Sequence, residues 1–287
     1  MELQFNTKGE LRAFLSHQSK TKSVGFVPTM GALHQGHISL LQRAFQENDL
    51  VVTSIFVNPT QFNNSEDLAN YPSTLEKDLK LIGEVSKEIV VFTPSIQEMY
   101  QENVQSKSYD FEGIDLHLEG LDRPGHFDGV GTIVEALLRT VAPTKAYFGE
   151  KDFQQLLIVK SLVKQLQLPI EIISCPIVRE ANGLAMSSRN ERLTPQQRDR
   201  ASLIYQSLIK AVNLAKEQTP QQVRNYIENI FATEVDFELN YFEIACVDNF
   251  LPVTEFEQNK HYRFLIAVVF KGVRLIDNTG YVHLGSY

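Results

Sequence analysis

The sequence predicts an α/β protein in which a Rossmann-like, doubly wound parallel sheet is followed by a smaller C-terminal α+β domain. Short apolar runs alternate with helical patterns from about residue 23 to residue 177, which is typical of parallel α/β sheets. The runs are continuously apolar, as expected for strands buried on both faces. Beyond residue 189, two helical patterns precede a group of strand-like segments. We therefore expect one domain over residues 1–180 and a second over residues 181–287.

Five apolar segments define the strands of the first domain, and four amphipathic segments define its helices. The expected strands are 24–27, 50–57, 89–92, 146–148 and 170–173, and the expected helices are 38–45, 75–85, 133–141 and 156–166. Ligands of such sheets bind at the carboxyl ends of the strands. The loops that follow the strands are therefore where we look for chemistry.

The second domain begins with helices and ends with strands. Thr194 and Pro195 give an N-cap and a first-turn proline for one long helix that reaches about Lys216. Pro220 opens another helix that ends near Thr233. The segments 239–247, 262–270 and 273–276 alternate in polarity or are apolar, which indicates a small sheet.

Charge and composition exclude several classes of function. The 287 residues carry a net charge of −8, and no long basic block is present, so broad binding to nucleic acid or to anionic membranes is not expected. The two cysteines, Cys175 and Cys246, lack the spacing of a disulfide framework or a thiolate zinc site. No apolar run approaches the ~18 residues of a membrane span, and the first residues lack a signal-peptide pattern, so we expect a cytoplasmic protein.

The first segment that carries chemistry is 28–37, between the first strand and the first helix. Its glycines allow a close approach of backbone N–H groups to a phosphate at a helix N-terminus. The place of the P-loop lysine is taken by His37, and Ile38 follows without a hydroxyl, which disfavours an ordinary P-loop ATPase. His34 and His37 are three residues apart, so both can contact one polyphosphate. A zinc site or a purely structural role is the alternative for this pair.

Two further loops are candidates for substrate contact. Asn58 and Gln61 follow the second strand and offer uncharged donors and acceptors suited to a small hydroxy acid; the alternative is a simple turn. The glycine-rich segment 119–131 contains Glu119 and Arg123 and resembles a mobile lid that brings Arg123 over the reactants. The alternative for this segment is a plain connecting loop.

The last two segments supply positive charge. Lys151 and Asp152 lie in 147–155, again between a strand and a helix, where a lysine can place its charge against a phosphate. At the domain boundary, Ser187, Ser188 and Arg189 combine two hydroxyls with a guanidinium, which suits an anion clamp. A solvated lysine and a polar linker are the respective alternatives.

Taken together, these segments resemble the pantothenate synthetase (pantoate–β-alanine ligase) family. The motifs PTMGALHxGH, NPTQF, RPGHF, GEKDFQQ and MSSRN occur in this order, and the resemblance extends from Phe26 to the segment 274–278. The family belongs to the nucleotidyltransferase superfamily that carries HIGH and KMSKS signatures. His34 to His37 correspond to HIGH, and residues 185–189 stand in the place of KMSKS. Both signature lysines are missing here, so Arg189 and Lys151 would have to supply the positive charge.

The resemblance implies an ATP-dependent condensation of pantoate with β-alanine through a pantoyl adenylate, with release of pyrophosphate and AMP. It implies that residues 1–180 bind nucleotide and pantoate and that residues 181–287 form a lid domain. It also implies a homodimer formed through the N-terminal domain. ATP is then a substrate and Mg²⁺ a cofactor held mainly by phosphates and water, with no protein ligand named for the metal.

The resemblance also assigns roles to residues. His37 is a proton donor, His34 a phosphate contact, and Lys151 and Arg189 complete the catalytic set. Gln61 and Gln155 hold pantoate, Gln61 also touches β-alanine, Asn58 assists, and Glu119 and Arg123 belong to the lid. The ATP site consists of Met30, Gly31, Ala32, Leu33, His34, Gln35, Gly36, His37, Gly149, Glu150, Lys151, Asp152, Val178, Met186, Ser187, Ser188 and Arg189.

Three other functions remain open on the sequence. An adenylyltransferase that acts on a phosphate acceptor uses a similar first loop, but the amides of Gln61 and Gln155 suit a hydroxy acid better than a phosphate. A tRNA-binding synthetase fits poorly with the charge of −8. A nucleotide-sensing module without catalysis is the alternative from a different class.

Overall fold

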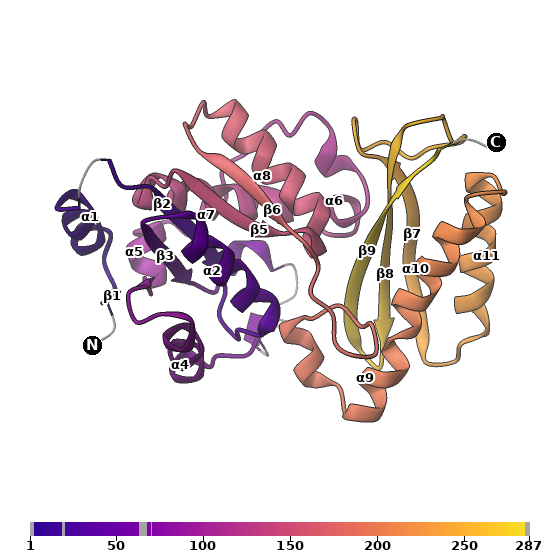
Figure 1. Cartoon of the computed structure of the whole chain (residues 1–287), viewed down its shortest axis with the longest axis horizontal. Helices are drawn as coiled ribbons and strands as arrows, with labels where there is room; N and C mark the ends of the chain where they lie inside the picture. Colours follow the sequence, from indigo (N-terminus) through magenta and orange to yellow (C-terminus); the bar gives the residue numbers. More distant parts are fainter. Residues whose placement is uncertain (1–2, 19–20, 63–67, 70, 285–287) are drawn as a thin grey trace. The chain divides into compact units, whose positions relative to one another are not determined.

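The chain divides into two units, and the boundary between them lies between Ile177 and Val178. The sequence predicts a boundary between residues 180 and 181. Figure 1 shows the computed structural model, which describes residues 3–18, 21–62, 68–69 and 71–284. In this part of the chain, no helix is long and apolar enough to cross a membrane.

The first unit is built on a six-stranded sheet with the order β1-β4-β3-β2-β5-β6. Each pair of neighbouring strands is parallel. The predicted fold class, a doubly wound parallel sheet followed by an α+β domain, is thereby confirmed. The strands are β1 (Leu3–Phe5), β2 (Val24–Thr29), β3 (Leu50–Ile55), β4 (Val90–Phe92), β5 (Lys145–Gly149) and β6 (Glu171–Cys175).

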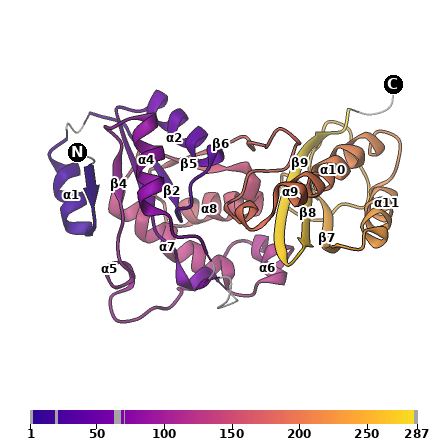
Figure 2. The same cartoon turned by 90° about the horizontal axis from the view of Figure 1, so that it is seen from below.

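Helices cover both faces of this sheet. Figures 1 and 2 show α2 and α4 on one face and α7 and α8 on the other. The helices are α1 (Lys8–Ser16), α2 (Gln35–Glu47), α4 (Leu75–Val85), α5 (Ile96–Tyr100), α6 (Glu119–Asp122), α7 (His126–Val141) and α8 (Phe153–Gln165), with short 3₁₀ turns η1 (Pro59–Gln61), η2 (Ile114–Leu116) and η3 (Glu150–Asp152).

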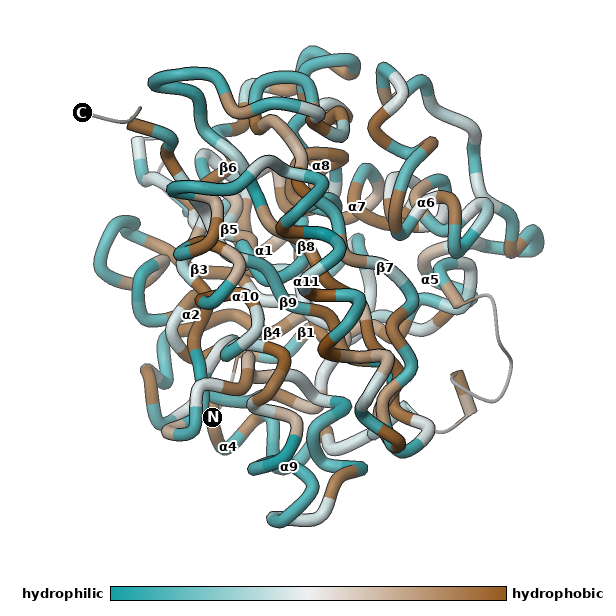
Figure 3. Tube along the Cα trace, turned by 90° about the vertical axis from the view of Figure 1, so that its right-hand side faces the viewer, coloured by the Kyte–Doolittle hydropathy of each residue, from teal (hydrophilic) through white to brown (hydrophobic). Residues whose placement is uncertain are grey.

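The continuously apolar strands are explained by this two-sided cover. Val27, Val51 and Val91 belong to one core cluster with the apolar faces of α2 and α4. Their neighbours Phe26 and Val52 are also fully buried and, by the alternation of a strand, point to the opposite face. Figure 3 colours the chain by hydropathy and shows brown, apolar stretches alternating with teal, polar ones along the trace.

The order of the strands places three candidate loops at one edge. From β2 the chain moves outward through β3 and β4 on one side, and β5 and β6 are added on the other side. Because the strands are parallel, the loops after β3, β2 and β5 emerge together at the carboxyl edge, at the point where the strand order reverses. These loops carry Asn58 and Gln61, then His34 and His37, then Lys151.

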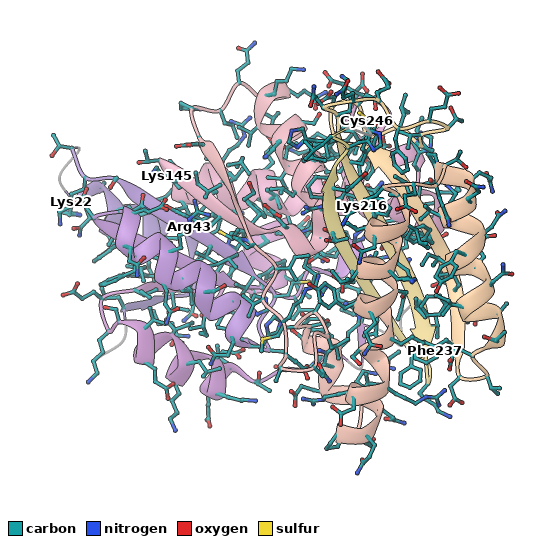
Figure 4. The ribbon with its side chains drawn as sticks, turned by 45° about the vertical axis from the view of Figure 1, so that its right-hand side comes forward. Lys22, Arg43, Lys145, Lys216, Phe237 and Cys246 are labelled. Carbon is teal, nitrogen blue, oxygen red and sulfur yellow. The ribbon has the colours of Figure 1, made fainter. Side chains whose placement is uncertain are left out.

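Polar bonds hold α2 in place across the sheet. Arg43, labelled in Figure 4, donates from Nη1 to the carbonyl oxygen of Ser174 at 2.8 Å and pairs through Nε with Glu47 at 2.8 Å. The other Glu47 oxygen accepts from Tyr147 Oη at 2.9 Å. These contacts join α2 to β5 and β6, and therefore help to fix the direction in which its N-terminus points. Cys175 beneath Arg43 and Cys246 in the second unit are both free thiols.

The second unit has a three-stranded antiparallel sheet, β7 (Phe237–Cys246), β8 (His261–Phe270) and β9 (Val273–Val282). Figure 1 shows α10 and α11 beside this sheet, and their apolar residues share one core with it. The other elements are η4 (Ser188–Arg192), α9 (Pro195–Ala201), α10 (Leu203–Leu214) and α11 (Pro220–Thr233).

The prediction of one long helix from Thr194 to about Lys216 is wrong. The helix is interrupted at Ser202, which separates α9 from α10. The Ser202 hydroxyl donates to the carbonyl oxygen of Asp199 at 2.6 Å, and the Ser202 N–H reaches the same oxygen at 3.3 Å. A serine side chain that competes for a backbone carbonyl tightens the turn locally. This bond explains the break, which helical periodicity alone did not reveal.

Candidate active site

The two histidines of the first loop form the N-terminal cap of α2. His34 Nδ1 accepts a hydrogen bond from the backbone N–H of Gly36 at 3.1 Å, and His37 Nδ1 accepts one from the N–H of His34 at 3.3 Å. The ring centroids are 4.1 Å apart. Because both Nδ1 atoms are acceptors, the neutral rings carry their proton on Nε2. Both histidines are therefore arranged as Nε2–H donors.

The surroundings of the pair disfavour positive charge on the rings. Burial lowers the pKa of His34 to about 3, with further contributions from His37 and Lys151. Burial and the charge of Lys151 lower the pKa of His37 to about 4. At neutral pH both imidazoles are uncharged in the free protein, so they donate hydrogen bonds without acting as ready proton sources.

Lys151 brings a fixed positive charge to the same edge of the sheet. It lies in η3, directly after β5, and its side chain is only 18% exposed. Its Nζ is 3.5 Å from Asp152 Oδ1. Its charge lowers the pKa of both imidazoles, so Lys151 lies within electrostatic range of His34 and His37.

The backbone N–H groups of the first loop are used inside the protein. Gly31 donates to Thr29 Oγ1 at 3.2 Å, and the N–H groups of Ala32 and Leu33 donate to Asp78 at 2.9 and 2.8 Å. We expected the glycines to bring such N–H groups to a phosphate. In this structure the N–H groups of Gly31, Ala32 and Leu33 therefore already have protein acceptors.

The loop after β3 contains a buried amide network. Asn58 is 1% exposed; its Nδ2 donates to Gln61 Oε1 and to the carbonyl oxygen of Gly129, both at 3.1 Å. Its Oδ1 accepts from the hydroxyl of Tyr100. Gln61 in turn donates from Nε2 to Met30 Sδ at 2.9 Å. The Asn58 amide is thus committed to holding Gln61 beside the first loop.

The predicted lid segment is attached to this network. Arg123 donates from Nη2 to the carbonyl oxygen of Gln61 at 3.0 Å and lies 3.5 Å from Glu119. His126 Nδ1 bonds to the same carbonyl oxygen at 2.8 Å, so Nδ1 carries the proton and Nε2 accepts from Arg123 at 3.2 Å. Burial and the Arg123 charge lower the pKa of His126 to about 4.

The two glutamines at the start of α8 have different environments. Gln154 is buried and donates from Nε2 to the carbonyl oxygens of Ile114 and His117 at 2.8 and 2.7 Å, while its Oε1 accepts from the N–H of Glu119 at 3.0 Å. Gln154 therefore anchors the segment that leads into α6. Gln155, the residue expected to hold pantoate, is partly exposed on the next position of the helix.

Five residues of the predicted ATP site, Val178 and 186–189, lie in the second unit. Met186 N–H donates to the carbonyl oxygen of Val178 at 3.0 Å, which places two residues of the expected ATP set side by side. Ser187 caps η4 by accepting from the N–H of Arg189 at 3.3 Å, while Ser188 is buried.

A buried ion pair supports the loop of the second unit. Arg179 binds both oxygens of Asp277, with N···O distances of 2.6 and 2.9 Å, and its guanidinium lies 3.6 Å above the centroid of the Tyr205 ring. Arg179 also donates to the carbonyl oxygen of Gly183 at 3.1 Å. The pair fixes the start of the loop against β9.

Metal ligands are not clustered in the described ranges. No group of three or more His, Cys, Asp or Glu residues suitable for a metal ion occurs there. The zinc alternative for His34 and His37 therefore has no third ligand of these types in that part of the chain.

Sequence reasoning did not single out Asp78, Tyr100, His126 or Gln154, although all four hold the site together. Asp78 offered the clearest signal, because it lies on the apolar face of an amphipathic helix between Leu75 and Ile82. A buried carboxylate in such a position needs partners. The role of Tyr100 depends on tertiary contacts that no local pattern reveals.

Comparison with known proteins identifies the family. The model of the pantoate-beta-alanine ligase family matches residues 4–280. The pantothenate synthetase of Flavobacterium psychrophilum is 49% identical over 277 residues, which cover 96% of this chain and 97% of that protein. The pantothenate synthetase of a Bacteroides fragilis strain is 44% identical over 277 residues, covering 96% and 98% of the two chains.

Solved structures show the same architecture over nearly the whole chain. Pantothenate synthetase from Thermus thermophilus superposes with a TM-score of 0.89 at 39% identity, covering 97% of this chain and 99% of that one. Pantoate-beta-alanine ligase from Francisella tularensis, crystallised with beta-gamma ATP and beta-alanine, gives a TM-score of 0.80 at 35% identity, with 97% of each chain covered. On the strength of the matched sequence, the loops at the carboxyl edge and these structures, the chain belongs to the pantoate-beta-alanine ligase family.

Proposed function

We propose that this protein joins pantoate to β-alanine at the expense of ATP, which is converted to AMP and pyrophosphate. Family membership supports this proposal, and so does the Francisella relative that was crystallised with beta-gamma ATP and beta-alanine. The observation that carries it is the group of two neutral imidazole donors and one lysine at the carboxyl edge of the sheet.

The reaction explains why such groups are needed. In the first step, a pantoate carboxylate oxygen forms a bond to the α-phosphorus of ATP, and the bond from that phosphorus to the pyrophosphate oxygen breaks. Negative charge accumulates on the phosphoryl oxygens, which fixed donors and a lysine stabilise. We assign this role to the Nε2–H groups of His34 and His37 and to Lys151. In the free protein His37 is a neutral hydrogen-bond donor, and its role as a proton donor to the reactants remains a prediction.

The second step consumes the acyl adenylate. The β-alanine nitrogen forms a bond to the carbonyl carbon, the bond from that carbon to the AMP oxygen breaks, and the amine loses a proton. Gln61 and Gln155 are assigned to pantoate, and Gln61 also to β-alanine. Asn58 and Arg123 support Gln61 through the hydrogen bonds described above. The proposed ATP site consists of residues 30–37, 149–152, Val178 and 186–189.

Magnesium belongs to the same proposal. Mg²⁺ commonly binds through substrate phosphates and water, together with one or two carboxylates. We assign it to the ATP phosphates and name no protein ligand; when bound, Mg²⁺ would neutralise charge on the phosphates. Three further predictions belong to this proposal: a cytoplasmic location, a homodimer formed through the first unit, and a lid role for the second unit. Sedimentation velocity tests whether the protein is a dimer.

The deciding experiment separates the first step from the second. The protein is incubated with ATP, Mg²⁺, pantoate and labelled pyrophosphate, with β-alanine omitted. We expect label to enter ATP only when pantoate is present, and AMP and pantothenate to appear after β-alanine is added. Release of ADP would contradict the proposal. Exchange that requires a phosphate-bearing acceptor would identify an adenylyltransferase, and an inactive protein that still binds ATP would identify a sensor.

A further inference from the structure

A buried carboxylate outside the proposed substrate contacts controls the shape of the first loop. Asp78 lies in the first turn of α4 and is 1% exposed. Its Oδ2 accepts from the N–H of Ala32 at 2.9 Å, and its Oδ1 accepts from the N–H of Leu33 at 2.8 Å. Thr74 Oγ1 donates to Oδ1 at 3.2 Å. One carboxylate therefore joins α4 to the loop that precedes α2.

The backbone that Asp78 holds is unusual. Gly31 has φ +83° and Ala32 has φ +50°, so two successive residues adopt left-handed conformations. For an alanine this conformation is strained, because its Cβ crowds the backbone, and it persists where surrounding contacts determine it. Successive N–H groups in such a turn converge to form an anion-binding nest. In this loop the anion in the nest is the carboxylate of Asp78.

The occupied nest has two consequences for a phosphate ligand. A phosphate cannot use the Ala32 and Leu33 N–H groups while Asp78 holds them, and the carboxylate repels other anions from that side. The residue after Leu33 is His34, whose N–H binds His37 Nδ1 and whose Nδ1 binds the N–H of Gly36. The backbone conformation at Leu33 therefore sets the position of His34 and, through these hydrogen bonds, the direction of the Nε2–H bonds of His34 and His37.

We propose that Asp78 is a positioning residue, which fills the backbone nest at 31–33 and thereby aims the Nε2–H groups of His34 and His37 at the phosphates. Asp78 itself does not touch the substrate. The inference rests on the proposed function, because it assumes that the histidines face ATP.

The kinetic test uses Asp78→Asn, with Glu76→Gln as the matched control. Glu76 is an exposed acid in the same turn of α4, whereas an asparagine at 78 turns an NH₂ donor towards one of the two N–H groups. We expect the kcat of pantoate-dependent pyrophosphate exchange into ATP to fall on the order of 10²-fold, because a small misplacement of catalytic groups has an effect of this size. Glu76→Gln should match the parent protein. A lower KM for ATP with unchanged kcat would overturn the proposal, because Asp78 would then only repel ATP.

A second readout is independent of activity. The ¹⁵N shifts of the histidine rings distinguish the Nε2–H from the Nδ1–H tautomer. We expect His34 and His37 to be Nε2–H in the parent and in Glu76→Gln, and mixed in Asp78→Asn. Unchanged tautomers together with unchanged exchange would overturn the proposal. If the parent shows no exchange, the proposed function fails, while the tautomer result still decides whether Asp78 orients the rings.

Thr74→Val keeps the test decisive should Asp78→Asn not fold. This substitution preserves the shape of the side chain and removes only the hydrogen bond to Asp78 Oδ1. We expect a smaller change in the same direction, about severalfold in kcat, and partial mixing of the tautomers. Parent-like values for both measurements in Thr74→Val, with Asp78→Asn unfolded, would assign Asp78 to stability alone and overturn the proposal.

Discussion

At the scale of single residues, the chemistry of the site depends on how each side chain is buried and bonded. A histidine in water has a pKa near 6.5 and is partly charged at neutral pH. At the start of α2, burial and neighbouring positive charge lower the pKa values of His34 and His37 to about 3 and about 4. The bonds to Nδ1 then leave one donor on each ring. Because both rings are neutral, Lys151 supplies the positive charge among His34, His37 and Lys151.

Lys151→Met should therefore remove much of the transition-state stabilisation without removing the fold. Lys151 is partly buried, its Nζ is 3.5 Å from Asp152 Oδ1, and methionine keeps most of the apolar length of its side chain. We expect kcat for pantothenate formation to fall by about 10² or more, with the midpoint of thermal unfolding nearly unchanged. Lys160→Met, on the exposed face of α8, is the matched control. Parent-like turnover in Lys151→Met would remove Lys151 from the mechanism.

ATP binding should make the histidines take up protons. Phosphate charge beside the rings favours the imidazolium, so the pKa values of His34 and His37 should rise when ATP binds. Titration calorimetry at pH 6 in buffers of different ionisation enthalpy should show proton uptake that approaches zero at pH 8. The proton uptake should be smaller in His34→Asn and in His37→Asn. Because ATP itself changes protonation equally in every titration, the difference between each variant and the parent reports only the missing imidazole. Equal uptake in all three proteins would mean that the phosphates do not approach these rings.

At the scale of elements, the contact between η1 and α7 sets the position of Gln61. A side chain at Gly129 would place its Cβ 2.4 Å from the carbonyl oxygen of Thr60, which is far inside van der Waals contact. The glycine therefore permits the helix to approach the turn closely. The Gly129 carbonyl oxygen also accepts the bond from Asn58, so helix packing and the orientation of Gln61 are connected.

Gly129→Ala should move η1 away from α7 and weaken pantoate binding more than ATP binding. We expect the KM for pantoate to rise about tenfold or more and the KM for ATP to change little, as measured by initial rates. Gly9→Ala is the matched control, because Gly9 is in helix α1 and no atom lies within 4 Å of its added Cβ. Equal increases in both KM values would indicate a general loss of structure instead.

Sequence patterns predicted best the strands that helices cover on both faces of the sheet. The apolar runs of β2 and β3 are continuous because helices cover both faces of the sheet. By contrast, β1 and α1 were not predicted. β1 has only three residues, and it is a strand because it pairs with β4. A local window contains too little of such a strand to distinguish it from a loop.

The candidate site shows the same limit for side chains. The sequence indicated the loops of His34, Gln61 and Lys151, since loops at strand ends carry function in parallel sheets. It did not show that the Asn58 amide is used internally, or that Gln154 anchors the backbone while Gln155 is partly exposed. Such differences depend on partners that are distant in the sequence, as Tyr100 is for Asn58.

At the scale of the whole molecule, each unit has its own core and its own charged support. The first unit contains three histidines whose pKa values burial lowers, His34, His37 and His126. The second unit depends on the pairing of Arg179 with Asp277 and on the core shared by its sheet and helices. The two units should therefore respond differently to acid.

The stability of the first unit should fall as the pH decreases from about 6.5 to about 4. In this window an unfolded histidine binds a proton and the folded His34, His37 and His126 do not, so acid favours unfolding. The chain has no tryptophan, so Phe45→Trp on α2 and Tyr226→Trp on α11 each give a fluorescence reporter for one unit. In urea titrations of the Phe45→Trp protein, the free energy of unfolding should decrease with decreasing pH. The double substitution His34→Asn and His37→Asn should make this free energy depend less on pH.

The Tyr226→Trp protein is the control, because His34, His37 and His126 lie outside the unit that its tryptophan reports on. An unchanged pH dependence in the double variant would show that the two rings are not held neutral by the fold.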